Sequence, residues 1–204
     1  MTRIDTRRLG VMDIRFFNQI DFDCRRLAQF ISCTPTIMPP DFVHVLFDDS
    51  SAKINLRSRT PNSPFDRLLI DISCREPDWQ LSSIEQVCNS FLCPLSTVLD
   101  LHIEHRYSQQ VWKDDAIENT LWLQLLLPFT AVKNLYLTKE FVPGITDALK
   151  ELVGGRITEV LPSLQNIFVN GLQPSGSFQE NIGQFVAARQ LSDHPIAISV
   201  WDKD

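Results

Sequence analysis

Three segments of the chain share one spacing of apolar residues, in which the last two are separated by a single residue. They are Leu95-x-x-Val98-x-x-Leu101-x-Ile103, Phe129-x-x-Val132-x-x-Leu135-x-Leu137 and Leu161-x-x-Leu164-x-x-Ile167-x-Val169. The residues Leu101, Leu135 and Ile167 lie 34 and then 32 residues apart. In a weaker fourth copy, Leu68 lies 33 residues before Leu101, and Asn62 stands at the first apolar position. Because the closing alternation has period 2, each copy predicts a short strand with one buried face.

Apolar residues between these predicted strands recur with the spacing of a helix face. The four sets are Leu81, Ile84, Cys88, Phe91 and Leu92; Ile117, Leu121 and Leu125; Ile145, Ala148, Leu149, Leu152 and Val153; and Phe178, Ile182, Phe185 and Val186. The expected helix ends are capping boxes at Ser82-x-x-Glu85 and Ser177-x-x-Glu180, an N-cap at Asp114 and a C-terminal end at Gly154-Gly155. Repeated strand–helix–strand units place parallel strands on one face and helices on the other. The sequence therefore predicts an α/β fold, a short degenerate solenoid resembling leucine-rich repeats.

The amino-terminal half follows a less regular pattern. Residues 42–47 and 51–57 alternate as strands, and the Asp48-Asp49-Ser50 turn between them predicts a β-hairpin. Residues 24–32 have the pattern of a helix. We therefore divide the chain as follows: a flexible leader over 1–13, an irregular part with the hairpin over 14–64, and a repeat-like α/β region over 65–204 that forms one continuous domain with 14–64. The alternation of Ile196, Ile198 and Val200 predicts a last edge strand.

Composition limits the classes of function. The 44% of hydrophobic residues is enough for a packed core, and the net charge of −6 argues against general binding to nucleic acid or anionic membranes. No apolar run is long enough to span a bilayer, and the amino terminus lacks the apolar core of a secretory signal. The five cysteines, Cys24, Cys33, Cys74, Cys88 and Cys93, form no CxxC pair. We expect them to be reduced, and the protein to be intracellular, in the cytoplasm or nucleus.

Four segments, 73–89, 122–141, 148–176 and 182–202, resemble the F-box-like proteins of mushroom-forming fungi, which carry a degenerate leucine-rich-repeat tail. In that family an amino-terminal F-box docks a Skp-type adaptor, and the repeats are expected to hold a substrate for a cullin-based ubiquitin ligase. This chain has no Leu-Pro-x-Glu opening and no helical triplet before the repeats, so it resembles the tail only. The resemblance implies a Skp-type adaptor only if an upstream F-box exists. The Asn of regular leucine-rich repeats is replaced here by Arg106, Glu140 and Leu172.

Residues that flank the buried strand positions must face the other side of the sheet. The middle flanking residue is His102, Tyr136 or Phe168 on the three repeated strands. Neighbouring strands lie about 4.8 Å apart, so we expect these rings to stack across the sheet. Polar residues border the rings, with Asp100, Asn134 and Asn166 before them and Glu104, Thr138 and Asn170 after them.

Exposed aromatic side chains with a polar rim are typical of protein-binding surfaces. The hypothetical protein-binding residues are therefore His102, Tyr136, Phe168, Asp100, Asn134, Asn166 and Glu104. In the alternative interpretation, the carboxyl-terminal segment or a further domain covers these rings.

Other groups with reactive side chains have ordinary structural explanations. The His102-Ile-Glu-His105 spacing resembles a metal site, but a strand turns its neighbours to opposite faces. Asp48-Asp49 and Asp114-Asp115 fit a turn and a helix start. The chain has no G-x-x-x-x-G-K-[ST], G-x-G-x-x-G or G-x-S-x-G motif. The sequence therefore assigns no catalytic residue, metal or cofactor.

These patterns favour a non-enzymatic interaction module that holds a protein partner on the sheet face, like the substrate-binding tail of an F-box-like ubiquitin-ligase adaptor subunit. One alternative is a truncated remnant without independent function. Another is a small metal-dependent enzyme that uses His102, Glu104 and a nearby carboxylate. A pocket with converging ionisable groups would favour the enzyme, whereas a flat sheet face would not.

Overall fold

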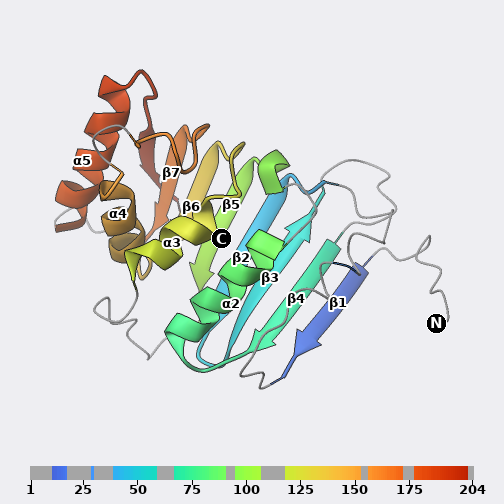
Figure 1. Ribbon diagram of the computed structural model, residues 1–204. Coiled ribbons are helices and arrows are strands. Elements are labelled where there is room, and N and C mark those ends of the chain that lie inside the picture. The colour runs from blue at the N-terminus through green and yellow to red at the C-terminus, as the bar shows by residue number, and fades with distance from the viewer. Residues whose placement is uncertain are drawn as a thin grey trace.

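A mixed β-sheet forms the centre of the molecule (Figure 1). The computed structural model describes residues 11–17, 29, 39–58, 67–90, 95–106, 118–152, 156–171 and 177–201. The strands in this part of the chain are β1 (Val11–Phe16), β2 (Phe42–Asp48), β3 (Ser51–Arg57), β4 (Arg67–Ser73), β5 (Asp100–His105), β6 (Asn134–Thr138), β7 (Asn166–Asn170) and β8 (Ala197–Val200). They form one eight-stranded sheet in the order β1-β4-β3-β2-β5-β6-β7-β8.

Four helices are described besides a single 3-10 turn, η1 (Leu95–Thr97). They are α2 (Pro77–Ser90), α3 (Asn119–Leu126), α4 (Val142–Lys150) and α5 (Ser177–Leu191). Figure 1 shows all four on the same side of the sheet. The expected α/β architecture, with helices on one face, is therefore confirmed.

The parallel half of the sheet follows the repeated apolar pattern. Strands β5, β6, β7 and β8 are parallel neighbours, and Leu101, Leu135 and Ile167 lie opposite one another in register. All three side chains are fully buried beneath the helices, as are Ile103 and Val169, the second apolar residues of β5 and β7. The buried apolar positions were therefore read correctly from the sequence, but Asp100 and Glu104 of β5, which were expected to face solvent, are buried as well.

The antiparallel half contains the predicted hairpin. Strands β2 and β3 pair from Phe42 opposite Arg57 to Asp48 opposite Ser51, which leaves a two-residue turn at 49–50. Strand β4 pairs antiparallel with β3, and β1 pairs parallel with β4.

The strand of the weaker fourth copy does not pair with the strand of the copy that follows it in the sequence. Its strand, β4, runs in the same direction as β5, but β3 and β2 lie between them. The reason is that β2 already pairs with β5 in parallel, so that edge of β5 is occupied by the hairpin. The sheet is therefore mixed, rather than a stack of four similar copies.

Several expected boundaries differ from the structure. Helix α2 begins at Pro77, so Ser82 lies inside the helix and forms no capping box. Proline suits the first helical turn because it has no N–H to leave unpaired. The buried Gln80 then fixes this turn by donating to the backbone oxygens of Asp48 and Cys74. The N-cap of α3 is Glu118 instead of Asp114.

Other expectations fall outside the described residues. The C-terminal end at Gly154-Gly155 is one of these, as is the 24–32 helix except for the helical Gln29. The last predicted strand is confirmed as β8, which lies at the edge of the described sheet. Strand β1 at the opposite edge was not predicted. No helix in the described ranges is long and apolar enough to cross a membrane.

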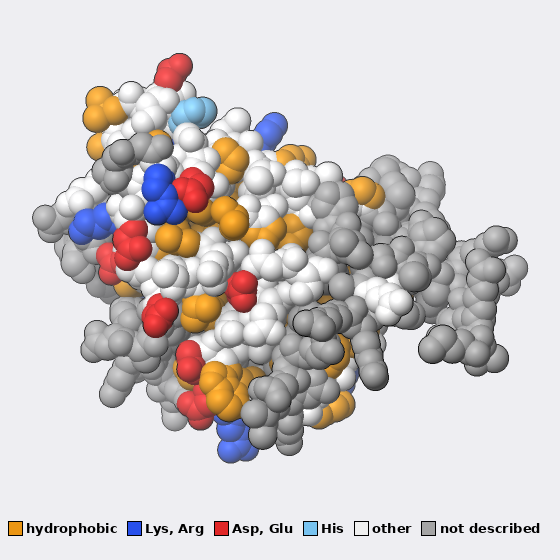
Figure 2. Space-filling model, viewed as in Figure 1, with side chains coloured by type: hydrophobic (Ala, Val, Ile, Leu, Met, Phe, Trp, Pro, Cys, Tyr) orange, Lys and Arg blue, Asp and Glu red, His pale blue; other side chains and the backbone are white. Residues whose placement is uncertain are grey.

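The outer surface of the helices is mixed in character. Viewed from the helix side, apolar side chains emerge in small groups among acidic, basic and neutral ones (Figure 2). An exposed charged pair joins Arg156 to Glu159, three residues apart. The more unusual arrangement of side chains is on the opposite face of the sheet.

Candidate functional site

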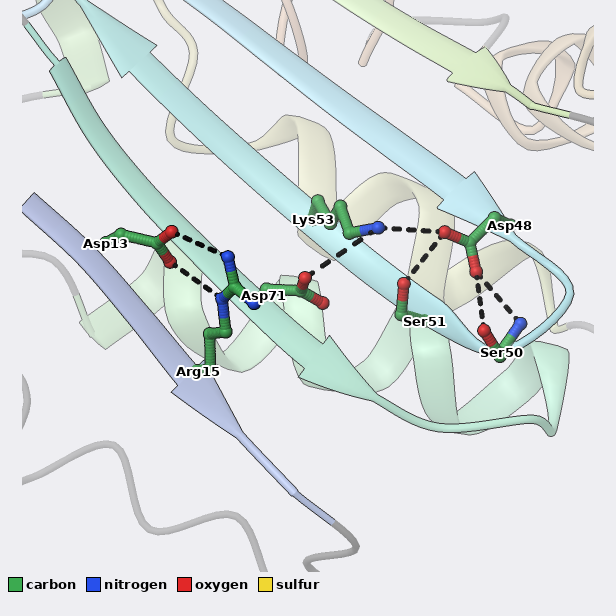
Figure 3. A network of polar contacts seen from close by, with 7 residues as sticks. All are labelled: Asp13, Arg15, Asp48, Ser50, Ser51, Lys53 and Asp71. Atoms are coloured by element: carbon green, nitrogen blue, oxygen red, sulfur yellow. Dashed lines mark hydrogen bonds and ion pairs between the residues drawn. The ribbon is translucent and has the colours of Figure 1, made fainter.

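The sheet face opposite the helices has an ionic half, on the strands of the antiparallel region. There Asp13 pairs with Arg15 on β1, and Lys53 lies 3.0 Å from the Asp48 carboxylate and 3.7 Å from that of Asp71 (Figure 3). The Arg15 pair is well exposed, and salt bridges of this kind contribute little. These contacts are typical of a solvated face, whereas the parallel half of the same face carries aromatic side chains.

The aromatic row, defined as His102, Tyr136 and Phe168, crosses three neighbouring parallel strands. The residues lie opposite one another in register. The His102 and Tyr136 rings stack with centroids 4.0 Å apart, and the Tyr136 and Phe168 rings stack at 4.6 Å. The interplanar angles are only 16° and 12°. The structure thus brings together the three rings that the sequence placed side by side.

The row continues onto β2 through residues that the sequence did not assign to it. His44 lies opposite His102, with ring centroids 5.9 Å apart, and Phe42 approaches the His102 ring at 4.8 Å. The alternation of His44 with the buried Val43 and Val45 had indicated its face but not its neighbour. That β2 lies beside β5 was not predicted, so the extended row could not be foreseen.

Glu104 lies beneath this row with only 3% of its surface exposed. Its carboxylate oxygens are 3.4 Å from Nε2 of His44 and 3.5 Å from Nδ1 of His102. The Nε2 atom of His44 is buried and forms no hydrogen bond of ordinary geometry within the described part of the chain. The carboxylate therefore lies within 3.5 Å of one ring nitrogen of each imidazole, at the β2 end of the row.

The His102-Ile-Glu-His105 motif does not converge on one point. His105 contacts Phe141 of the core, with ring centroids 5.8 Å apart, whereas His102 belongs to the aromatic row. Burial lowers the pKa of His105. In the described ranges, no group of three or more His, Cys, Asp or Glu side chains could hold a metal ion.

An amide ladder, defined as Asp100, Asn134 and Asn166, runs beside the aromatic row. The Asn134 amide donates to the Asp100 carboxylate at 2.7 Å, and the Asn166 amide donates to the Asn134 oxygen at 2.8 Å. Asp100 is 8% exposed. Each residue starts its strand, so the ladder fixes the register at the point where the parallel strands begin. On the other side of the row, Thr138 accepts a hydrogen bond from the His105 amide.

Trp201 follows β8 and turns its indole ring onto the aromatic row. The ring is edge-on to His102 at 5.9 Å and to Tyr136 at 5.5 Å, with interplanar angles of 79° and 85°. The carboxyl-terminal segment therefore covers part of the row, in line with the alternative stated for this surface. The sequence gave no signal that the ring of Trp201, a lone tryptophan after an edge strand, would lie against the row.

No protein-family model, curated protein or solved structure matches the chain. The contacts of the surface itself indicate what it can bind. Flat rings offer stacking area, and amides and carboxylates beside them offer hydrogen bonds to an extended chain.

Proposed function

We propose that this chain is a non-enzymatic protein-interaction module, and that its partner binds the sheet face along the aromatic row. The in-register stacking of His102, Tyr136 and Phe168 carries this proposal. Core packing does not require aromatic residues at these positions, since the helices cover the other face. Large, rigid rings that have few rotamers to lose are favoured at the centre of protein interfaces.

We further propose that the parallel region is a short solenoid related to leucine-rich repeats. Strands with 34- and 32-residue spacing, helices on one side and an amide ladder along the strand starts support this interpretation. The resemblance to the F-box-like proteins of mushroom-forming fungi would make the module a substrate-binding tail of a ubiquitin-ligase adaptor subunit. A Skp-type adaptor would then bind through an upstream F-box, not through these residues. The free thiols Cys74 and Cys88 support a location in the cytoplasm or nucleus.

The experiment is affinity capture from a lysate of a mushroom-forming fungus with quantitative mass spectrometry. The wild-type chain is compared with Tyr136→Ala and Phe168→Ala, each checked for an unchanged far-UV circular dichroism spectrum. The matched control is Trp79→Ala, which removes an exposed aromatic ring from α2 on the helix side. We expect specific partners to be depleted at least about 10-fold by the two row variants and retained by the control, since such rings are interface anchors.

Equal capture of specific partners by all four proteins would contradict the proposal. If the wild-type chain captures no specific partner, the result would instead fit the remnant without independent function.

A further inference from the structure

The segment Ala197–Trp201 lies on the molecule in the manner of an added peptide. Strand β8 pairs with β7, and no other described strand lies beyond it. All four of its residues are exposed, Val200 to 60%. Backbone bonds hold its ends, from the Ala197 amide to the Gln165 oxygen at 2.8 Å and from the Trp201 amide to the Val169 oxygen at 3.3 Å.

The side-chain anchor of this segment is Trp201, and its fit is incomplete. The ring contacts His102 and Tyr136 edge-on, as described above. Its Nε1 atom is buried but has no hydrogen-bond partner among the described residues. A buried indole N–H normally finds an acceptor, so Trp201 fits this position less well than a side chain with its polar group satisfied.

We propose that Trp201 occupies a subsite for an aromatic side chain of the partner, and that a partner segment adds to β7 in place of Ala197–Trp201. The partner would be an extended, uncharged strand followed by an aromatic residue. It would pair in parallel with β7 and set its ring against His102 and Tyr136. This inference rests on the proposed function of the same face, and it adds both a chemical class of partner and a competitor within the chain.

Two observations favour this occupant over others. The chain's own segment of that composition already pairs with β7, and the site is continuous with the aromatic row. Strand addition also satisfies the backbone groups at the edge of a sheet. Competition by the tethered segment lowers the apparent affinity for a partner by the fraction of molecules in which the subsite is open.

The test uses the full chain and a peptide that copies residues 194–204, with a second peptide in which the tryptophan is replaced by alanine. Binding is measured by isothermal titration calorimetry to the wild type, to Trp201→Ala, which vacates the subsite, and to Ser199→Pro. The proline weakens β8 because proline disrupts strand pairing, and it leaves the row residues intact. Leu191→Ala, a change at an exposed residue at the end of α5, is the matched control.

We expect the tryptophan peptide to bind both variants at least about 10-fold more tightly than the wild type or the control, and the alanine peptide to bind at least about 10-fold more weakly than the tryptophan peptide. Equal affinity for all four proteins, binding that ignores the tryptophan, or no binding to either variant would overturn the inference. Row-dependent capture from the lysate together with no peptide binding would leave the proposed function standing and reject the subsite. Tryptophan-dependent peptide binding without row-dependent capture from the lysate would reject the proposed function and keep the subsite.

Discussion

Gly144 lies so close to Trp122 that a Cβ atom at position 144 would stand 2.8 Å from Nε1 of the indole. Trp122 is buried on α3 and contacts Phe141 edge-on at 5.5 Å, so its ring has little room to move. Alanine is a better helix former than glycine by about 1 kcal/mol. We nevertheless expect Gly144→Ala to lower the free energy of unfolding by about 1–3 kcal/mol, because overpacking outweighs propensity. Urea denaturation measures the change.

Gly183 provides the matched control for this prediction. It is an exposed residue of α5, and a Cβ atom there would meet no atom within 4 Å. Gly183→Ala should therefore raise the free energy of unfolding by about 0.5–1 kcal/mol. Shifts of the same sign in both variants would contradict the role assigned to Trp122.

The sequence predicted those features that depend on spacing along one strand or between repeats. Period-2 alternation gave the faces of β5, β6 and β7, and the near-constant spacing gave the register that stacks Tyr136 on Phe168. The Asp48-Asp49-Ser50 turn gave the β2–β3 hairpin for the same local reason.

Features that depend on which strands or segments pack side by side were missed. An apolar pattern does not say on which edge of β5 a hairpin adds, so His44 could not be placed beside His102. It also does not say that the side chain after the last strand will lie against the sheet face, as the Trp201 ring does. The start of α2 was missed because the Gln80 side chain anchors it to the backbone oxygens of Asp48 and Cys74, and no local capping box marks it.

Arg189 is fully buried at the end of α5, and its guanidinium donates to four backbone oxygens of one loop. These belong to Ile157 at 3.2 Å, Leu161 at 3.4 Å, Pro162 at 3.2 Å and Leu164 at 3.2 Å. Burial lowers the pKa of Arg189. We expect Arg189→Met to lower the free energy of unfolding by about 2–4 kcal/mol, since it leaves several buried oxygens without donors.

The free energy of unfolding of the conservative variant Arg189→Lys should lie between those of the wild type and Arg189→Met, because an ammonium group cannot donate to all four backbone oxygens. The matched control is Arg156→Met, which removes an exposed arginine paired with Glu159. It should leave the urea midpoint unchanged. A wild-type midpoint for Arg189→Met would show that the loop does not depend on the guanidinium.

Asn134 joins the amide ladder in both directions, as donor to Asp100 and acceptor from Asn166. We expect Asn134→Ala to lower the free energy of unfolding by about 1–3 kcal/mol, because it removes two hydrogen bonds between partly buried side chains. In a double-mutant cycle, Asn134→Ala and Asn166→Ala should be non-additive by at least about 0.5 kcal/mol. Gln165→Ala, at an exposed residue beside the ladder, is the control. Strict additivity in the cycle would mean that the ladder is only a row of independent side chains.

Asp48 gives the hairpin turn a defined response to acid. Burial alone would raise the pKa of its carboxyl, but the Ser50 amide at 2.9 Å, the Lys53 ammonium at 3.0 Å and the Ser51 hydroxyl at 2.8 Å lower the pKa to about 2 (Figure 3). The unfolded chain, with a pKa near 3.8, then binds this proton more readily than the folded chain. The stabilisation is fully present above about pH 4 and is lost as the pH falls toward about 2.

The predicted size of this effect is about 1–2 kcal/mol after allowance for the partial exposure of the pair. Asp48→Asn should therefore be less stable than the wild type at pH 5 and should lose less stability between pH 4 and pH 2.5, as measured by urea denaturation at each pH. Asp49→Asn, which changes the exposed neighbour in the same turn, should follow the wild-type curve. If the wild type and Asp48→Asn instead declined in parallel over this range, another carboxylate would have to account for the acid response of the fold.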